Sequence, residues 1–126
     1  MWSSDYFYFE IRFDQTYSRT INSSELLGFL VDEIYLVSDG TDSLVGNYQQ
    51  PWMNLTIVKA SKDGCFSSQR ECPEKVNLIS IVGSKKYNNY GEYEKILIKI
   101  AQWLKWELIE EEDDEGNEGV IIWSTK

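Results

Sequence analysis

Eight consecutive residues, Tyr6–Phe13, alternate strictly between apolar and more polar positions. One face of this segment carries Phe7, Phe9, Ile11 and Phe13, and the other carries Tyr6, Tyr8, Glu10 and Arg12. A period of two residues is typical of a strand that buries one face. The chain is therefore expected to contain a sheet with one face packed on a core and the other left to solvent.

Two segments have the pattern of amphipathic helices. Asn22-Ser23-Ser24-Glu25 places an N-cap residue three positions before a Glu, ahead of an apolar run, which predicts a helix over Ser23–Tyr35. Its end is open, because Glu33–Val37 could instead be extended. The second helix is predicted over Glu92–Leu104, where apolar residues recur at i, i+3, i+4, i+7, i+8 and i+11, namely Tyr93, Ile96, Leu97, Ile100, Ala101 and Leu104.

Two further strands are predicted between these helices. Ser38–Pro51 is rich in Gly, Asp and Asn and is expected to be a loop leading to a strand over Trp52–Ala60. A second loop, Lys62–Lys75, precedes a strand over Val76–Val82. Both faces of this last strand are partly apolar, which favours a central position in the sheet.

The C-terminal region has two interpretations. Either the second helix continues through Glu112, or Trp106–Glu111 forms a strand paired with Gly119–Trp123. We favour the β-hairpin, because GVIIW needs a strand partner and the Asp, Gly and Asn residues between the two segments suit a turn.

The order of elements is then β-α-β-β-α-β with one added strand. It predicts a single α+β domain over residues 1–126, in which two helices cover one face of an antiparallel sheet. The expected topology is a split βαβ (ferredoxin-like) sandwich with an added C-terminal β-hairpin. Because this topology serves many unrelated functions, it does not by itself indicate what the protein does.

The charge of the chain is concentrated in one segment. Residues 107–118 hold eight of its 21 acidic residues and no Lys or Arg, whereas the remaining 13 acids nearly balance 12 Lys plus Arg. A concentrated negative field can attract a basic partner or simply keep the protein soluble. The net charge of -9 argues against nucleic acid and anionic membranes as partners and favours a basic protein.

Most catalytic chemistry lacks its usual residues. The chain has no His, so Ser-His-Asp and Cys-His nucleophiles and the commonest metal ligand are missing. Cys65 and Cys72 cannot complete a four-ligand zinc site, and the acidic segment does not have the spacing of an EF-hand. Gly83-Ser84-Lys85-Lys86 lacks the spacing of a P-loop and is interpreted as a solvated loop that could contact an anion. We expect no enzymatic activity, no cofactor and no metal.

Aromatic residues are the other candidate for a binding surface, since Tyr and Trp often anchor protein interfaces. Tyr48 and Tyr87 lie in predicted loops, where burial is least assured, whereas Trp103 and Trp106 are expected in the core.

The sequence favours a cytoplasmic location. Its first residues, MWSSDYFYFEIRF, lack the features of a signal peptide, and no uncharged apolar stretch is long enough to span a membrane. Cys65 and Cys72 are then expected as free thiols, and a disulfide between them requires an oxidising compartment.

A small, acidic α+β chain without His that carries the segment IAQWLKWELIEEEDDEG resembles bacterial immunity proteins of contact-dependent inhibition and other polymorphic toxin systems. The resemblance covers general design across the chain and residues 100–116 in particular. It implies a toxin-neutralising protein that binds a cognate basic toxin domain, commonly a nuclease, in the bacterial cytoplasm. The residues expected to meet this partner are Glu110, Glu111, Glu112, Asp113, Asp114, Glu115, Tyr48 and Tyr87.

Two other functions stay open. One is a small ligand-binding or enzymatic domain that uses Tyr, Lys or carboxylates in a pocket between helices and sheet. The other is a structural or regulatory subunit that assembles through exposed sheet edges. The sequence does not indicate the oligomeric state.

Overall fold

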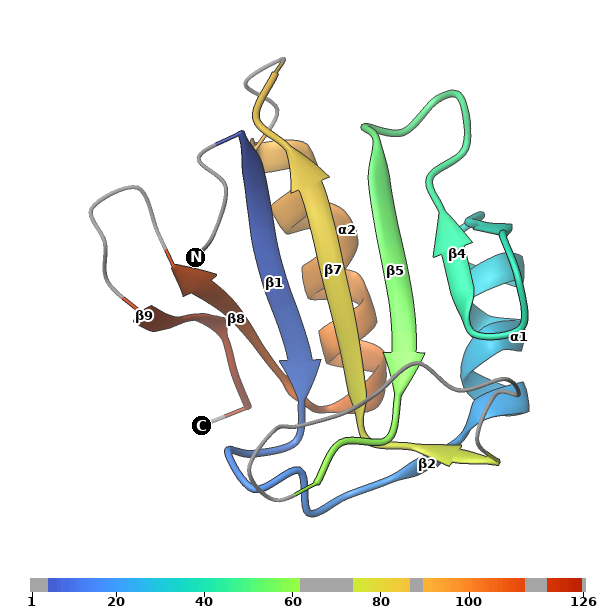
Figure 1. Cartoon of the computed structure of the whole chain (residues 1–126), viewed down its shortest axis with the longest axis vertical. Helices are drawn as coiled ribbons and strands as arrows, with labels where there is room; N and C mark the ends of the chain where they lie inside the picture. The colour runs from blue at the N-terminus through green and yellow to red at the C-terminus, as the bar shows by residue number, and fades with distance from the viewer. Residues whose placement is uncertain (1–4, 62–73, 87–89, 113–117, 126) are drawn as a thin grey trace.

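The protein is an α+β fold in which two helices pack on one side of an antiparallel sheet (Figure 1). The computed structural model describes residues 5–61, 74–86, 90–112 and 118–125. Its elements, in chain order, are β1 (Tyr6–Arg12), β2 (Ile21–Asn22), α1 (Ser23–Asp32), β3 (Val37–Ser38), β4 (Ser43–Val45), β5 (Met53–Val58), β6 (Lys75–Val76), β7 (Leu78–Ser84), α2 (Tyr90–Leu104), β8 (Glu107–Glu112) and β9 (Glu118–Trp123). The predicted α+β class, with an antiparallel sheet and two helices, is confirmed.

The main sheet has the strand order β3-β4-β5-β7-β1-β8-β9, and β2 pairs with β6 in a separate two-stranded ribbon. The predicted central position of this strand is confirmed, since β7 lies between β5 and β1. The predicted bounds Val76–Val82 are wrong, because Val76 belongs to β6 and β7 extends over Leu78–Ser84. In β7, Ile79 and Ile81 are fully buried and alternate with half-buried residues, because only one face of the sheet meets the helices.

The core lies between the sheet and the helices. The predicted apolar face of the first strand is confirmed: Phe7, Phe9 and Ile11 are 6%, 0% and 0% exposed. Leu26 and Leu30 of α1 and several residues of α2 pack against them, in one cluster with β5 and β7. Burying this apolar surface is the main term that stabilises the fold.

The first helix begins where the sequence predicts but ends earlier. Asn22 is the N-cap, although its side chain makes no capping hydrogen bond; instead the Ser23 N–H donates to the Glu74 carbonyl at 2.9 Å. The predicted end at Tyr35 is wrong, because Tyr35 has a φ of 64° and the Leu36 N–H closes the helix on the Leu30 carbonyl at 3.0 Å.

The predicted loop over Ser38–Pro51 is wrong in part, because β4 and part of the β3–β4 pair lie within it. Leu44 of β4 is fully buried opposite Leu55 of β5. One buried residue among turn residues gives no alternating pattern in the sequence, so β4 cannot be predicted locally and forms because the tertiary structure buries Leu44.

Between α2 and β8 the chain turns sharply. Lys105 has a φ of 60°, and the Trp106 N–H donates to the Ala101 carbonyl at 3.1 Å. Residues 107–112 form β8, which pairs antiparallel with β9, so the helical interpretation of this segment is wrong. The predicted turn at 113–117 and both cysteines lie outside the described residues.

Candidate functional site

One face of the sheet is covered by α1 and α2, and no helix of the described chain covers the other (Figure 1). We call this second side the open face. The strand registers place on it alternate residues of the four central strands, namely Tyr8, Glu10, Arg12, Asn54, Thr56, Val58, Leu78, Ser80, Val82, Glu107, Ile109 and Glu111. Most of these side chains are half-buried, which leaves part of each one accessible to a partner.

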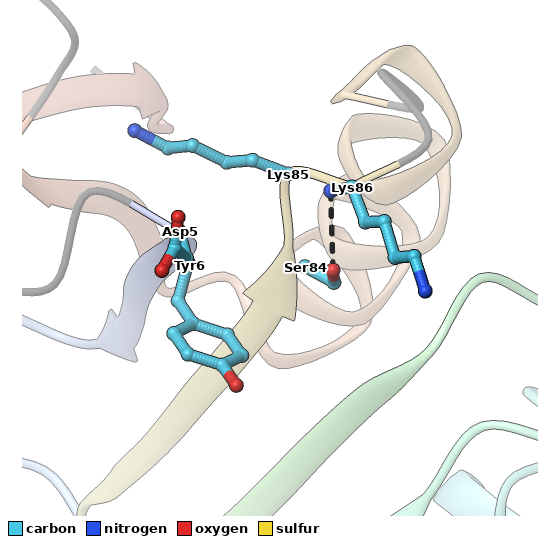
Figure 2. Close-up of a pocket in the computed structure, with 5 residues that line it drawn as sticks. All are labelled: Asp5, Tyr6, Ser84, Lys85 and Lys86. Atoms are coloured by element: carbon cyan, nitrogen blue, oxygen red, sulfur yellow. Dashed lines mark hydrogen bonds between the residues drawn. The ribbon is translucent and has the colours of Figure 1, made fainter.

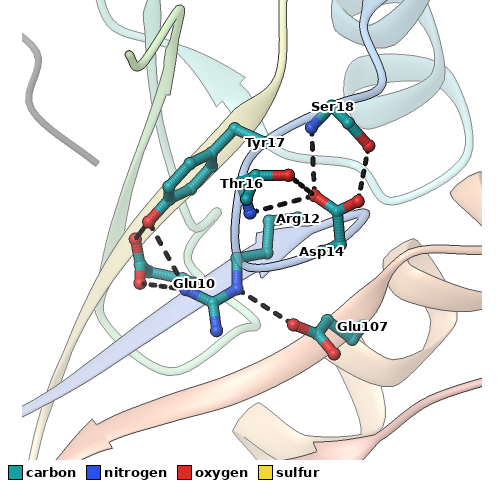
Figure 3. Close-up of polar contacts among 7 residues, drawn as sticks. All are labelled: Glu10, Arg12, Asp14, Thr16, Tyr17, Ser18 and Glu107. Atoms are coloured by element: carbon teal, nitrogen blue, oxygen red, sulfur yellow. Dashed lines mark hydrogen bonds and ion pairs between the residues drawn. The ribbon is translucent and has the colours of Figure 1, made fainter. Parts of the chain in front are cut away.

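Arg12 connects two carboxylates on the open face (Figure 3). Its Nε donates to Glu107 Oε1 of β8 at 3.0 Å, and its Nη1 lies 3.6 Å from Glu10 Oε2 of the same strand. The three side chains are only 12% to 13% exposed. This burial strengthens the pairing compared with an ion pair fully in water.

Tyr17 completes the network from a loop that folds over the end of β1 (Figure 3). Its Oη accepts a hydrogen bond from Arg12 Nη1 at 3.4 Å and donates one to Glu10 Oε1 at 3.2 Å. The loop holds Tyr17 at a φ of 55° because Asp14 Oδ1 accepts from the backbone N–H groups of Thr16 and Ser18. The hydrogen bond from the Ser18 hydroxyl, followed by those from the Ser18 backbone and from Thr16, lowers the pKa of Asp14 to about 2.

Two carboxylates of the open face have raised pKa values. Burial raises the pKa of Glu10 above its ordinary value, although Arg12 and the hydrogen bond from Tyr17 oppose the shift. Burial, and then the charge of Glu10, raises the pKa of Glu111 to about 7, and Arg12 again opposes. A cation placed beside Glu111 would favour the ionised form of its carboxyl group and so lower its pKa.

A hollow of about 360 Å³ lies where β1 begins and β7 ends (Figure 2). Asp5, Tyr6, Ser84, Lys85 and Lys86 line it. The side chains of Lys85 and Lys86 point to different sides of the hollow, so the two ammonium groups do not converge on one anion. The interpretation of Gly83–Lys86 as a solvated loop is wrong in part, because Gly83 and Ser84 are the last two residues of β7 and only Lys85 and Lys86 lie beyond the strand.

Exposed aromatic residues lie next to this hollow. The ring of Trp52 is 6.0 Å from that of Tyr6, between centroids, and Trp52 is 53% exposed. Tyr48 is 94% exposed, as its predicted position in a loop implies.

Of the two tryptophans expected in the core, Trp106 is buried, whereas Trp103 is 41% exposed and stacks on Phe29.

The predicted partner-binding residues are not all on one surface. Glu111 is on the open face, whereas Glu110 is 4% exposed and accepts a hydrogen bond from Tyr90 of α2 on the opposite face. Glu112 is the last residue of β8, and Asp113, Asp114, Glu115 and Tyr87 lie outside the described residues.

The sequence reasoning missed Glu10, Arg12, Tyr17 and Glu107 as site residues. A signal was present for two of them, because Glu10 and Arg12 are charged residues on the solvent side of a predicted strand. Nothing local to the sequence predicts their contact with Glu107, which is 95 residues from Arg12.

Within the described ranges, no group of three or more Cys, Asp or Glu side chains is arranged to hold a metal ion. No helix in the same part of the chain is long and apolar enough to cross a membrane. Comparison of the chain with models of protein families, with curated proteins and with solved structures finds no match.

Proposed function

We propose that this protein is a toxin-neutralising immunity protein that acts in the bacterial cytoplasm. It binds a cognate basic toxin domain, such as a nuclease domain, and has no catalytic role of its own. The observation that carries the proposal is the placement of Glu10, Glu107 and Glu111 on a sheet face that no described helix covers, where Arg12 pairs with Glu10 and Glu107.

Electrostatic complementarity supports this assignment. A basic domain would approach a chain whose net charge is -9 and would find half-buried carboxylates that its Lys and Arg side chains can neutralise. Trp52 and Tyr48 are large exposed side chains of the types that supply affinity in protein interfaces. The protein therefore offers both steering charge and exposed aromatic side chains.

We also infer that the fold is a split βαβ (ferredoxin-like) sandwich with an added C-terminal β-hairpin. The adjacency of β5, β7, β1 and β8, in this order, supports the first part, and the antiparallel pairing of β8 with β9 supports the second.

The direct test is survival. The larger protein encoded next to this chain's gene is searched for a basic C-terminal domain, which is then expressed with and without this protein. We expect the domain alone to stop growth and co-expression to restore it. Continued growth arrest despite full expression of both chains would contradict the proposed role.

A matched pair of variants tests the surface. Glu111→Gln with Glu118→Gln removes two acids from β8 and β9, whereas Glu25→Gln with Glu92→Gln removes two exposed acids from the helices. We expect only the first variant to slow association, by roughly tenfold in about 20 mM salt and far less in about 500 mM salt. Equal slowing by both variants would mean that net charge alone acts.

A further inference from the structure

The two edges of the main sheet differ in length. One edge is β3, which has two residues, and the other, within the described residues, is β9, which has six. Natural sheets keep their edge strands short or protect them with Lys, Pro or a covering segment, because an edge presents unpaired backbone groups. β3 follows this rule by its length, whereas β9 does not.

The side chains of β9 offer little protection either. Its sequence, EGVIIW, has no Lys or Pro, its one charged residue is Glu118 at its start, and Ile121 is 59% exposed. Gly119 has a φ of 63°, which interrupts the regular strand near that start. The register with β8 also shifts between Leu108 and Ile109, which leaves Ile122 as an extra residue in β9. Pairing on the outer side is therefore expected at Val120 and Ile121 and again at Trp123.

A second hollow lies beside this edge and is acidic. It has a volume of about 420 Å³ and is lined by Asp14, Gln15, Thr16, Glu107, Ile121 and Ser124. An apolar stem can pack on Ile121 while a charged end reaches the carboxylates, which is how Lys and Arg side chains cover mixed surfaces. Strands in a sheet are about 4.8 Å apart, so a strand added to β9 would lie within reach of this hollow.

We propose that β9 is a β-augmentation site that pairs with an extended basic strand of the partner protein, whose Lys or Arg side chain enters the hollow beside Ile121. This inference rests on the proposed binding function and adds the mode of binding. The charge of this edge favours a basic strand over a second copy of this chain. A second copy would bring its own acidic β8–β9 pair to the same edge, whereas a basic strand complements the negative charge there.

The experiment uses the whole protein and a synthetic probe. The probe is a blocked L-peptide of about seven residues that alternates Lys and Val, the length and pattern of one strand. Backbone amide exchange is followed by NMR with this peptide, with its all-D enantiomer and with a peptide in which Glu replaces Lys. We expect the L-peptide alone to protect amides within Val120–Trp123, and the other two to bind at least about tenfold more weakly.

Two edge variants test the location. Ile121→Lys places a charge on the proposed edge, and Val37→Lys makes the same change at an exposed position, 49% accessible, on the opposite edge. We expect Ile121→Lys to weaken peptide binding by at least about fivefold and Val37→Lys to leave it unchanged. Both sites are exposed, and circular dichroism verifies that both variants fold.

Several results would overturn the inference: no L-peptide binding up to about 1 mM, equal binding of the D-peptide, protection outside β9, or self-association that Ile121→Lys abolishes. The last result would identify a second copy as the occupant. Failure of the survival test with β9 protection intact would reject the immunity role alone, whereas neutralisation without β9 protection in the toxin complex would reject only this binding mode.

Discussion

The Tyr90 hydroxyl donates a hydrogen bond to Glu110 Oε1 at 2.9 Å and so links the start of α2 to β8. Glu110 is 4% exposed, although it belongs to the most acidic segment of the chain. Phe9 lies opposite Glu110 on β1, and Tyr90 packs against Phe9 with ring centroids 5.9 Å apart. One carboxylate of the acidic segment thus belongs to the core side of the sheet.

Tyr90→Phe removes this hydrogen bond and keeps the ring. We expect the free energy of unfolding, measured in urea, to fall by about 1 to 3 kcal/mol, because a buried carboxyl group loses a partner. Tyr48→Phe is the control, since Tyr48 is 94% exposed, and it should leave stability unchanged. Equal stability of the two variants would show that the bond contributes nothing net.

Glu111 should make stability depend on pH. Its folded pKa of about 7 lies above the ordinary value of 4.5, so the folded state holds the proton more tightly and loses stability as the pH rises through this window. The carboxyl group keeps some solvent contact, so we expect Glu111→Gln to stabilise the protein by about 1 kcal/mol at pH 8 and by little at pH 4.5. Urea unfolding across this range measures the difference, and a gain independent of pH would contradict it.

Arg12 holds two carboxylates together, and Arg12→Met leaves both without this cation. We expect a loss of about 2 kcal/mol in the free energy of unfolding at pH 7.5, because like charges then lie close in a half-buried site. Adding Glu10→Gln and Glu107→Gln to Arg12→Met should recover most of it. A triple variant as unstable as the single one would show that Arg12 acts through packing rather than charge.

Gly83 lies against the ring of Tyr93, and a Cβ added there would be 2.8 Å from Tyr93 Cζ. The Tyr93 ring is fully buried, and its hydroxyl accepts a hydrogen bond from the Ser84 N–H and donates one to the Trp52 carbonyl, so the ring has little freedom to move. Gly83→Ala is expected to lower the melting temperature and to reduce the free energy of unfolding by about 2 kcal/mol or more. Gly28→Ala, in α1 with no atom within 4 Å of the added Cβ, should instead stabilise by up to about 1 kcal/mol.

Lys105 ends α2 in the left-handed region, with a φ of 60°. Lys105→Gly should raise the free energy of unfolding by up to about 1 kcal/mol, because glycine adopts this conformation without steric strain. The same substitution at Lys99, inside α2, should lower it by about 1 kcal/mol. Thermal unfolding of the two variants measures these changes. If the free energy of unfolding fell in both, the conformation at Lys105 would not be strained.

The helix ends show where local reasoning stops. Tyr35 and Lys105 both adopt positive φ values, a conformation that usually selects Gly, so the sequence carries no signal for either turn. The packing that follows each turn holds it in place: Leu36 and Trp106 are both buried, at 2% exposed. Hence the strand interpretation of residues 106–111 could be favoured from the sequence but not decided by it.

What the sequence determined by itself is periodic: the strand at Tyr6–Arg12, the two amphipathic helices and the concentration of acid near the C-terminus. These features depend on residues within a few positions of one another, where side-chain spacing dictates a face. Only the tertiary structure decided which carboxylates share a surface. It directs Glu110 toward α2 and Glu111 to the open face, and it brings Glu107 to Arg12 from 95 residues away, because strand register is set by long-range pairing that no local pattern encodes.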